Sequence, residues 1–83
     1  MMIKVRYRAH LAQSVNTGEE LVDAASVMDV LKHIKRQYGK QTEKTARSMI
    51  IAVNGQSILQ LKHFKTPLQD GDEVSFLPIC GGG

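Results

Sequence analysis

The sequence predicts an α+β domain in which one main helix covers a mixed sheet of four to five strands. Three observations carry this prediction. A run near the start alternates with period two, a single stretch in the middle has clear helical periodicity, and strand-like runs bounded by turn signals follow it. The expected order is two strands, the helix and three more strands.

The first strand is predicted over residues 3–9, where apolar and basic side chains alternate. Its apolar face comprises Ile3, Val5, Tyr7 and Ala9, and its basic face comprises Lys4, Arg6, Arg8 and His10. This basic face is either an ordinary solvated sheet face or a docking patch for an acidic partner. Asn, Gly and Ser residues then predict a turn, followed by a short second strand over residues 20–23.

The helix is the clearest element. Ser26 precedes the periodic run and Asp29 follows three residues later, in the manner of a capping box. The apolar positions that share one helical face are Val27, Val30, Leu31, Ile34 and Tyr38. Gly39 provides a stop signal, so the sequence predicts an amphipathic helix of about three turns.

After the helix, the polar stretch 40–48 is predicted to be a loop. Residues 49–53 are apolar and predict a buried strand, and Asn54-Gly55 predicts a tight hairpin that returns through a short strand over 56–61. Asp70-Gly71 predicts a second turn. The last strand covers 73–78, with Val74 and Phe76 on one face and Ser75 and Leu77 on the other.

Length and composition place the chain in a broad class. Eighty-three residues make one domain, and a net charge of +3 lacks the clustered basic stripe of a nucleic-acid-binding protein. One cysteine excludes an internal disulfide, the start has no signal-peptide pattern, and the longest apolar run, 49–53, is too short to cross a membrane. We therefore expect a cytoplasmic protein that binds neither nucleic acid nor membrane.

The sequence ends in "FLPICGGG", which divides it into a domain over 1–77 and a flexible glycine tail over 78–83. Fully extended, these last residues reach roughly 20 Å, and glycines can enter a crevice too narrow for any Cβ. The reactive group of such a tail is the carboxylate of Gly83. A free carboxylate is a poor acyl donor, and the chain has no phosphate-binding motif of its own. We therefore expect activation by a partner that uses ATP, with no cofactor bound by the chain itself.

The segments "VNG" at 53–55 and "PLQDGDEVSFLP" at 67–78, together with the terminal glycines, resemble the MoaD/ThiS group of sulfur carrier proteins. The resemblance spans the whole chain and is nearest to MoaD, the small subunit of molybdopterin synthase. It implies a ubiquitin-like β-grasp fold and a carrier that is not itself an enzyme.

The resemblance also implies a mechanism. An E1-like enzyme of the MoeB/ThiF type adenylates the carboxylate of Gly83, and sulfur replaces AMP to give a thiocarboxylate. In the molybdopterin pathway this group delivers sulfur within a complex with the large synthase subunit. On this chain Gly81 and Gly82 would thread the partner's active sites, and the residues expected to contact the partner are Leu77, Pro78, Ile79 and Arg8.

The sequence departs from the family pattern at Arg6 and Arg8, at Cys80 and at Gly81. The departures at Cys80 and Gly81 leave other recipients open: thiazole synthesis, cysteine synthesis and tRNA thiolation. A ubiquitin-like protein modifier is a further alternative, as is a plain binding module. The three histidines lack the spacing of metal ligands, so no metal site is expected.

Overall fold

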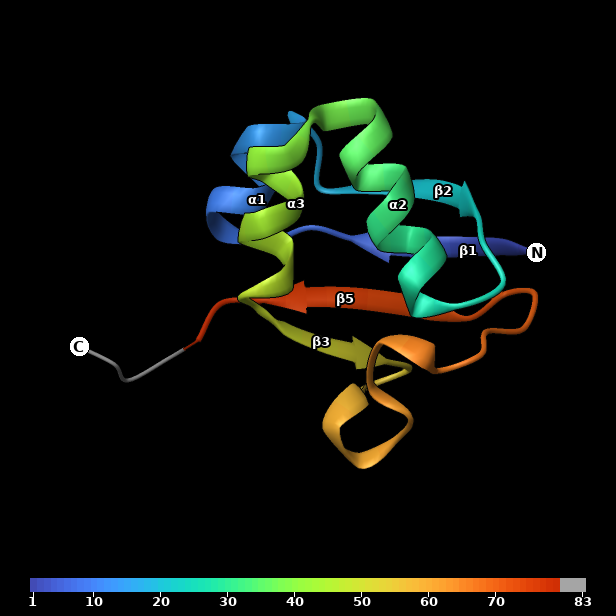
Figure 1. Cartoon of the computed structure of the whole chain (residues 1–83). Coiled ribbons are helices and arrows are strands. Elements are labelled where there is room, and N and C mark those ends of the chain that lie inside the picture. Colours follow the sequence, from blue (N-terminus) through green and yellow to red (C-terminus); the bar gives the residue numbers. More distant parts are fainter. Residues whose placement is uncertain (80–83) are drawn as a thin grey trace.

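The structure, a computed structural model, describes residues 1–79 (Figure 1). Five strands form one sheet in the order β2-β1-β5-β3-β4. Their bounds are β1 Met2–Arg6, β2 Glu19–Asp23, β3 Ile50–Val53, β4 Gln56–Ser57 and β5 Glu73–Leu77. β5 runs parallel to β1, and every other pair is antiparallel, so the sheet is mixed as expected.

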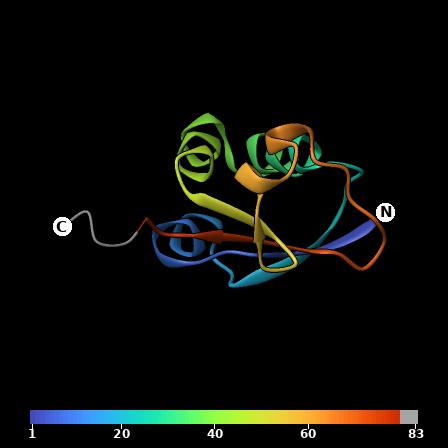
Figure 2. The same cartoon turned by 90° about the horizontal axis from the view of Figure 1, so that it is seen from below.

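Three α-helices accompany the sheet: α1 Ala9–Val15, α2 Val27–Tyr38 and α3 Lys40–Arg47. α2 and α3 cover one face of the sheet, while α1 lies beside the end of β5 (Figures 1 and 2). Two short 3₁₀ turns, η1 Ile58–Gln60 and η2 His63–Lys65, connect β4 to the segment before β5. The α+β class is therefore confirmed, with α2 as the main helix.

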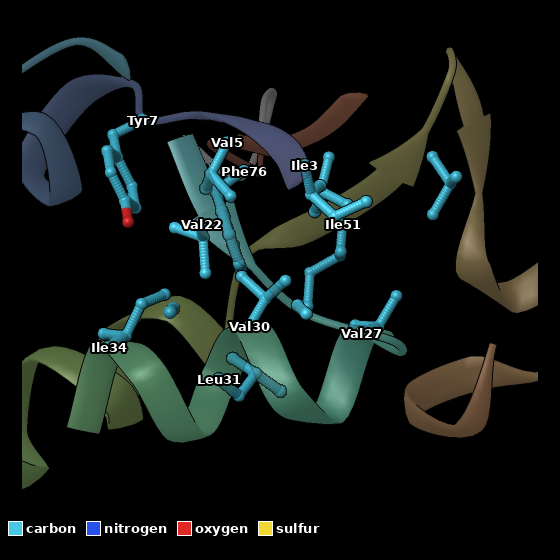
Figure 3. Packing of buried hydrophobic residues seen from close by; sticks show 14 of the residues in the cluster. Ile3, Val5, Tyr7, Val22, Val27, Val30, Leu31, Ile34, Ile51 and Phe76 are labelled. Carbon is cyan, nitrogen blue, oxygen red and sulfur yellow. The ribbon is translucent and has the colours of Figure 1, made fainter. Parts of the chain in front are cut away.

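The core lies between α2 and the inward face of the central strands (Figure 3). The helix contributes four completely buried side chains, namely Val27, Val30, Leu31 and Ile34. The strands contribute Ile3, Val5, Val74 and Phe76, which are also fully buried. Ser26 caps the helix as predicted, since its Oγ accepts from the N–H of Asp29 at 3.3 Å and Asp29 reaches back to the N–H of Ala25 at 3.1 Å.

The prediction for the segment after the first strand was incomplete. The strand ends at Arg6, Tyr7 remains buried, and Ala9 is exposed rather than inward. Residues 9–15 form α1 instead of a turn, because Leu11 and Val15 lie one helical turn apart and both enter the core. Asn16, with a φ of 61°, then ends the helix in the left-handed conformation.

The loop predicted for 40–48 is wrong, since Lys40–Arg47 is helical. This helix buries Thr42 and Ala46, again one turn apart, and an i,i+4 ion pair joins Glu43 to Arg47 at 3.0 Å. Only one of these two buried residues is apolar, so the sequence shows no apolar helical face in this segment. Gly39, with a φ of 98°, separates it from α2.

The hairpin at Asn54-Gly55 is confirmed, and both residues have positive φ. The returning strand is shorter than predicted, because β4 contains only Gln56 and Ser57 before η1 begins. The Asn54 side chain joins this turn to the next one: it donates to Asp72 Oδ1 and accepts from the N–H of Glu73, both at 3.0 Å. The two turns beside β5 are therefore cross-linked.

Across residues 1–79, none of the helices combines the length and the apolar character that a membrane crossing requires.

Candidate functional site

Several chain segments converge at the edge of the sheet where β5 ends. Because β1 and β5 are parallel, their carboxyl ends lie at the same edge. Tyr7 and Arg8, which follow β1, therefore lie beside the end of β5 at Leu77. β3 is antiparallel to β5, and its first residue, Ile50, pairs with Leu77. The end of α3, which leads into β3, reaches the same edge (Figure 1). We call this place the exit edge, because the described part of the chain ends there, at Pro78 and Ile79.

The outward face of the exit edge is apolar. Along β5, Val74 and Phe76 point into the core, so Leu77 points outward, as predicted, and is half-buried. Its cross-strand neighbour Ile50 is 41% exposed, and Ile79 is 67% exposed. Apolar side chains that remain exposed together mark a place where another surface can dock.

Two surface depressions flank Ile79. The first, about 320 Å³, is lined by α1 and α3 residues together with Pro78 and Ile79, and His10 and Met49 belong to it. The second, about 270 Å³, is more apolar and contains Ile50, Leu59 and Phe64. Ile79 therefore lines two hollows, both of which could receive side chains of a partner.

Most of the apolar residues at this edge are not recognisable from sequence patterns. Ile50 belongs to an apolar run that predicts a buried strand, yet it is the first strand residue and lies outward. Leu59, which is 72% exposed, was assigned to a returning strand and belongs instead to η1. Most apolar residues on both sides of the hairpin are buried, including Ile51, Val53 and Ile58. The sequence therefore holds no local signal that separates Ile50 and Leu59 from them.

The predicted basic face differs in character from a free cationic patch. Arg6 Nε lies 3.5 Å from Glu73 Oε2 and 3.9 Å from Glu19 Oε2, and Lys4 Nζ lies 3.9 Å from the same Glu19 oxygen. Arg6 Nε makes no hydrogen bond, so these are charge contacts rather than aligned bonds. Each is worth little for stability, but together they neutralise this face. A partner that binds here does not need to be acidic.

Arg8 lies at the exit edge with an exposed side chain. Its backbone is the N-cap of α1, and its carbonyl accepts from the N–H groups of Leu11 and Ala12. The next residue, Ala9, has a φ of 54°, a conformation that costs a residue with a Cβ roughly 1–2 kcal/mol. The fold therefore holds Arg8 at this edge against local strain.

A carboxylate beneath the exit edge joins two tyrosines. Glu20 Oε2 accepts from the hydroxyl of Tyr7 at 2.5 Å and from that of Tyr38 at 2.9 Å. His33 Nε2 lies 3.4 Å from Glu20 Oε1. Burial, and then the bond to Glu20, raises the pKa of Tyr7 and likewise that of Tyr38, so both phenols stay protonated and donate. The network fixes the end of β1, where the chain turns toward Arg8.

Cys80, Gly81, Gly82 and Gly83 lie outside the described residues, and so does most of the predicted tail at 78–83. The division at residue 77 therefore stays a prediction. Within residues 1–79, no three His, Cys, Asp or Glu side chains gather in the way that metal ligands do.

The chain matches a known protein family over nearly its whole length. A protein-family model described as the ThiS family matches residues 5–83. The chain belongs to the ThiS family. A protein of Archaeoglobus fulgidus named as a sulfur carrier protein is 32% identical, and the match covers all of both chains. The molybdopterin synthase sulfur carrier subunit of Escherichia coli is 28% identical over 99% of this chain and all of its own.

The fold comparison agrees. The solution structure of small archaeal modifier protein 1 from Methanosarcina acetivorans superposes with a TM-score of 0.87 at 27% identity, covering 100% of this chain and 99% of that one. This confirms the ubiquitin-like β-grasp fold and the resemblance to sulfur carriers of the MoaD/ThiS group. The chain thus belongs to a family of small sulfur carriers and ubiquitin-like modifiers.

Proposed function

We propose that this ThiS-family chain is a sulfur carrier whose Gly83 carboxylate is converted to a thiocarboxylate, and that the sulfur goes to molybdopterin synthesis. The observation that carries the proposal is the exit edge. An apolar rim formed by Leu77, Ile50 and Ile79 surrounds the point where the chain leaves toward its glycines. Such a rim allows a partner to bind the domain while the glycines enter the partner's active site.

The chemistry has two steps. First, the carboxylate oxygen attacks the α-phosphorus of ATP on an E1-like enzyme, which gives an acyl adenylate and releases pyrophosphate. Next, hydrosulfide sulfur attacks the acyl carbon, and the C–O bond to AMP breaks as AMP departs with the electron pair. The products are a thiocarboxylate, AMP and a proton. The chain supplies only the carboxylate and its delivery, so it acts as a co-substrate and not as the enzyme.

Two partners follow from this chemistry. One is the adenylating enzyme, of the MoeB/ThiF type, and the other is the large subunit of molybdopterin synthase, where the thiocarboxylate would give up its sulfur. The name of the Escherichia coli relative, a molybdopterin synthase subunit, supports this choice of recipient. Leu77, Pro78, Ile79 and Arg8 would contact both partners in turn, because both must reach the same carboxylate. Gly81 and Gly82 would lie in each active site.

Mass spectrometry of the intact protein tests the proposal. After incubation with the adenylating enzyme of the same organism, ATP and sulfide, the chain should gain about 16 Da, the difference between sulfur and oxygen. A variant lacking Gly82 and Gly83 is the control and should gain nothing. A chain that acquires no mass, or a truncated chain that acquires the same mass, contradicts the proposal.

A second function is favoured by the likeness to small archaeal modifier protein 1, which spans the whole chain. In that case the activated Gly83 forms an amide with a lysine of another protein. Immunoblots of an epitope-tagged chain would then show bands of higher mass that resist reduction and disappear when Gly82 and Gly83 are deleted.

A further inference from the structure

The excess positive charge of the molecule lies on its helices and not on the sheet face. Residues 27–47 contain six Lys and Arg against two Asp and Glu, a net charge of +4, whereas the whole chain carries +3. The remainder therefore carries a net −1. This segment comprises α2 and α3, which form the layer on one side of the sheet (Figures 1 and 2).

Five of these cations form what we call the helical patch: Lys32, Lys35, Arg36, Lys40 and Lys44. All are exposed, and none has an ion pair within the described part of the chain. Spacings of three and four residues place the α2 members on the helix face opposite its buried residues, and Lys40 and Lys44 also share one face of α3. A shallow depression of about 360 Å³, lined by residues that include Lys35, Lys40 and Lys44, brings the two helices' cations together.

The carboxylates of this segment do not neutralise the helical patch. Asp29 lies in the first turn of α2, where it caps the helix through the N–H of Ala25. Glu43 lines the depression but is bonded to Arg47 at 3.0 Å. Side chains three or four residues apart on a helix have Cβ atoms about 5–6 Å apart, so their charges lie on the scale of the Debye length of about 8 Å at physiological ionic strength and their fields add.

Helix stability accounts for only part of the arrangement. Like charges at i,i+4, as in Lys32 with Arg36 and Lys40 with Lys44, destabilise a helix. Lys40 is also the first residue of α3, the end at which the helix dipole disfavours a cation. Lys35, Arg36 and Lys44 lie in the last turns of their helices, where the dipole favours cations and offsets part of this cost. The like-charge pairs and Lys40 at the start of α3 still oppose helix formation, so helix stability explains only part of the cationic surface.

The helical patch is separate from the exit edge. The last turn of α3 and the two residues after it line the hollow beside Pro78 and Ile79, whereas Lys40 begins the helix. An eight-residue helix is about 12 Å long, so most of the patch stays accessible while the exit edge is occupied. Figure 1 shows the turn between α2 and α3 at the end of α3 away from β5.

We propose that the helical patch is a second docking surface, which binds an acidic surface on a protein partner of this chain. The identity of that partner rests on the proposed function, but the charge recognition does not. A protein is favoured over nucleic acid on two grounds. Tyr38, the aromatic residue between Arg36 and Lys40, is half-buried and bonded to Glu20, so it does not offer a free ring for stacking on bases. A long polyanion that extends past the patch also meets a remainder of net −1. Ion pairs at such a surface mainly raise the rate and selectivity of association.

The test uses the full chain and a fluorescein-labelled decaglutamate peptide as the acidic probe, with binding followed by fluorescence anisotropy at 50 and 200 mM NaCl. Lys40→Gln/Lys44→Gln should bind about tenfold more weakly than the wild type. The matched control, Lys62→Gln/Lys65→Gln, removes the same net charge at η2 and should stay within about twofold. Amide shift changes in a ¹H–¹⁵N titration should concentrate on residues 32–44.

Three results would overturn the proposal. The first is equal weakening in both double variants, which would show attraction to net charge alone. The second is the absence of peptide binding at 50 mM NaCl. The third is tighter binding of a 20-base-pair duplex DNA than of the peptide, dependent on the same lysines, which would make nucleic acid the partner. None of these measurements involves the carboxylate of Gly83, so their failure is distinguishable from failure of the mass test.

Discussion

Replacing Tyr7 with Phe tests whether the network at Glu20 holds the exit edge in place. The substitution keeps the ring, which is stacked on Phe76 at a centroid distance of 6.0 Å, and removes only the hydroxyl that donates to Glu20. Because Phe76 lies in β5, one residue before Leu77, the ring of Tyr7 connects the end of β1 to the strand that leads to the glycines.

The magnitude follows from what remains after the change. A hydrogen bond to a charged group contributes about 1.5–3 kcal/mol. Glu20 keeps its bond to Tyr38, and its side chain is 23% exposed, so water replaces part of the lost interaction. We therefore expect Tyr7→Phe to cost about 1–1.5 kcal/mol, or roughly 5–10 °C in Tm for a domain of this size.

A stricter test is the ranking of three variants by their loss of unfolding free energy. Glu20→Ala should cost more than Tyr7→Phe, since it leaves the hydroxyl of Tyr7, a residue that is 2% exposed, without its acceptor. Tyr38→Phe should cost less than about 1 kcal/mol, because Tyr38 is only half-buried. Urea denaturation followed by circular dichroism measures all three. A Tyr7→Phe variant as stable as the wild type would refute the reasoning.

Three further predictions follow. Phe76→Ala should cost about 3–5 kcal/mol in urea unfolding, because the side chain is fully buried, whereas Phe64→Ala, at a half-buried position, should cost less than half of that. Leu77→Asp should lower the Tm moderately, because Leu77 is half-buried, but the folded variant should lose co-elution with the adenylating enzyme. Leu21→Asp, at a position that is 65% exposed on the outer strand β2, should keep co-elution, and equal retention by both variants would contradict a docking role. Hydrogen bonds from Gln69 and then Asn54 lower the pKa of Asp72 below its ordinary 3.8, so its stabilisation is present above that pH and is lost as the pH falls through the lowered pKa. The Tm difference between the wild type and Asp72→Asn should therefore shrink in acid, and a difference that stays constant from pH 6 to about pH 2 would argue against this origin.

The elements with local signals were predictable from sequence. α2 has a capping serine, four apolar residues at helical spacing and a terminal glycine, so its bounds follow from neighbouring residues alone. The hairpin at Asn54-Gly55 and the alternation of β5 are equally local. α1 and α3 are shorter, and each buries only two residues one turn apart, so their helical state depends on the sheet and helices that they pack against.

The candidate site was predictable only in part for the same reason. The outward direction of Leu77 follows from the alternation along β5. The contacts of Arg6 with Glu19 and Glu73 depend on which strands are neighbours, and no pattern within β1 contains that information. Ile50 and Leu59 belong to the exit edge because of where β3 begins and how η1 turns. The sequence therefore indicated that Leu77 faces outward, whereas the residues that surround Leu77 depend on the order of the strands in the sheet.

The central position of β5 has a mechanical consequence. The strand that leads to the glycines lies between β1 and β3, and its hydrogen bonds to both run across the chain direction. A force that a partner applies along the tail therefore acts in shear on the hydrogen bonds of β5 to β1 and to β3 together. An outer strand would instead lose its hydrogen bonds one at a time. The domain can be drawn firmly toward a catalytic slot, and withdrawn from it, without unravelling from its end.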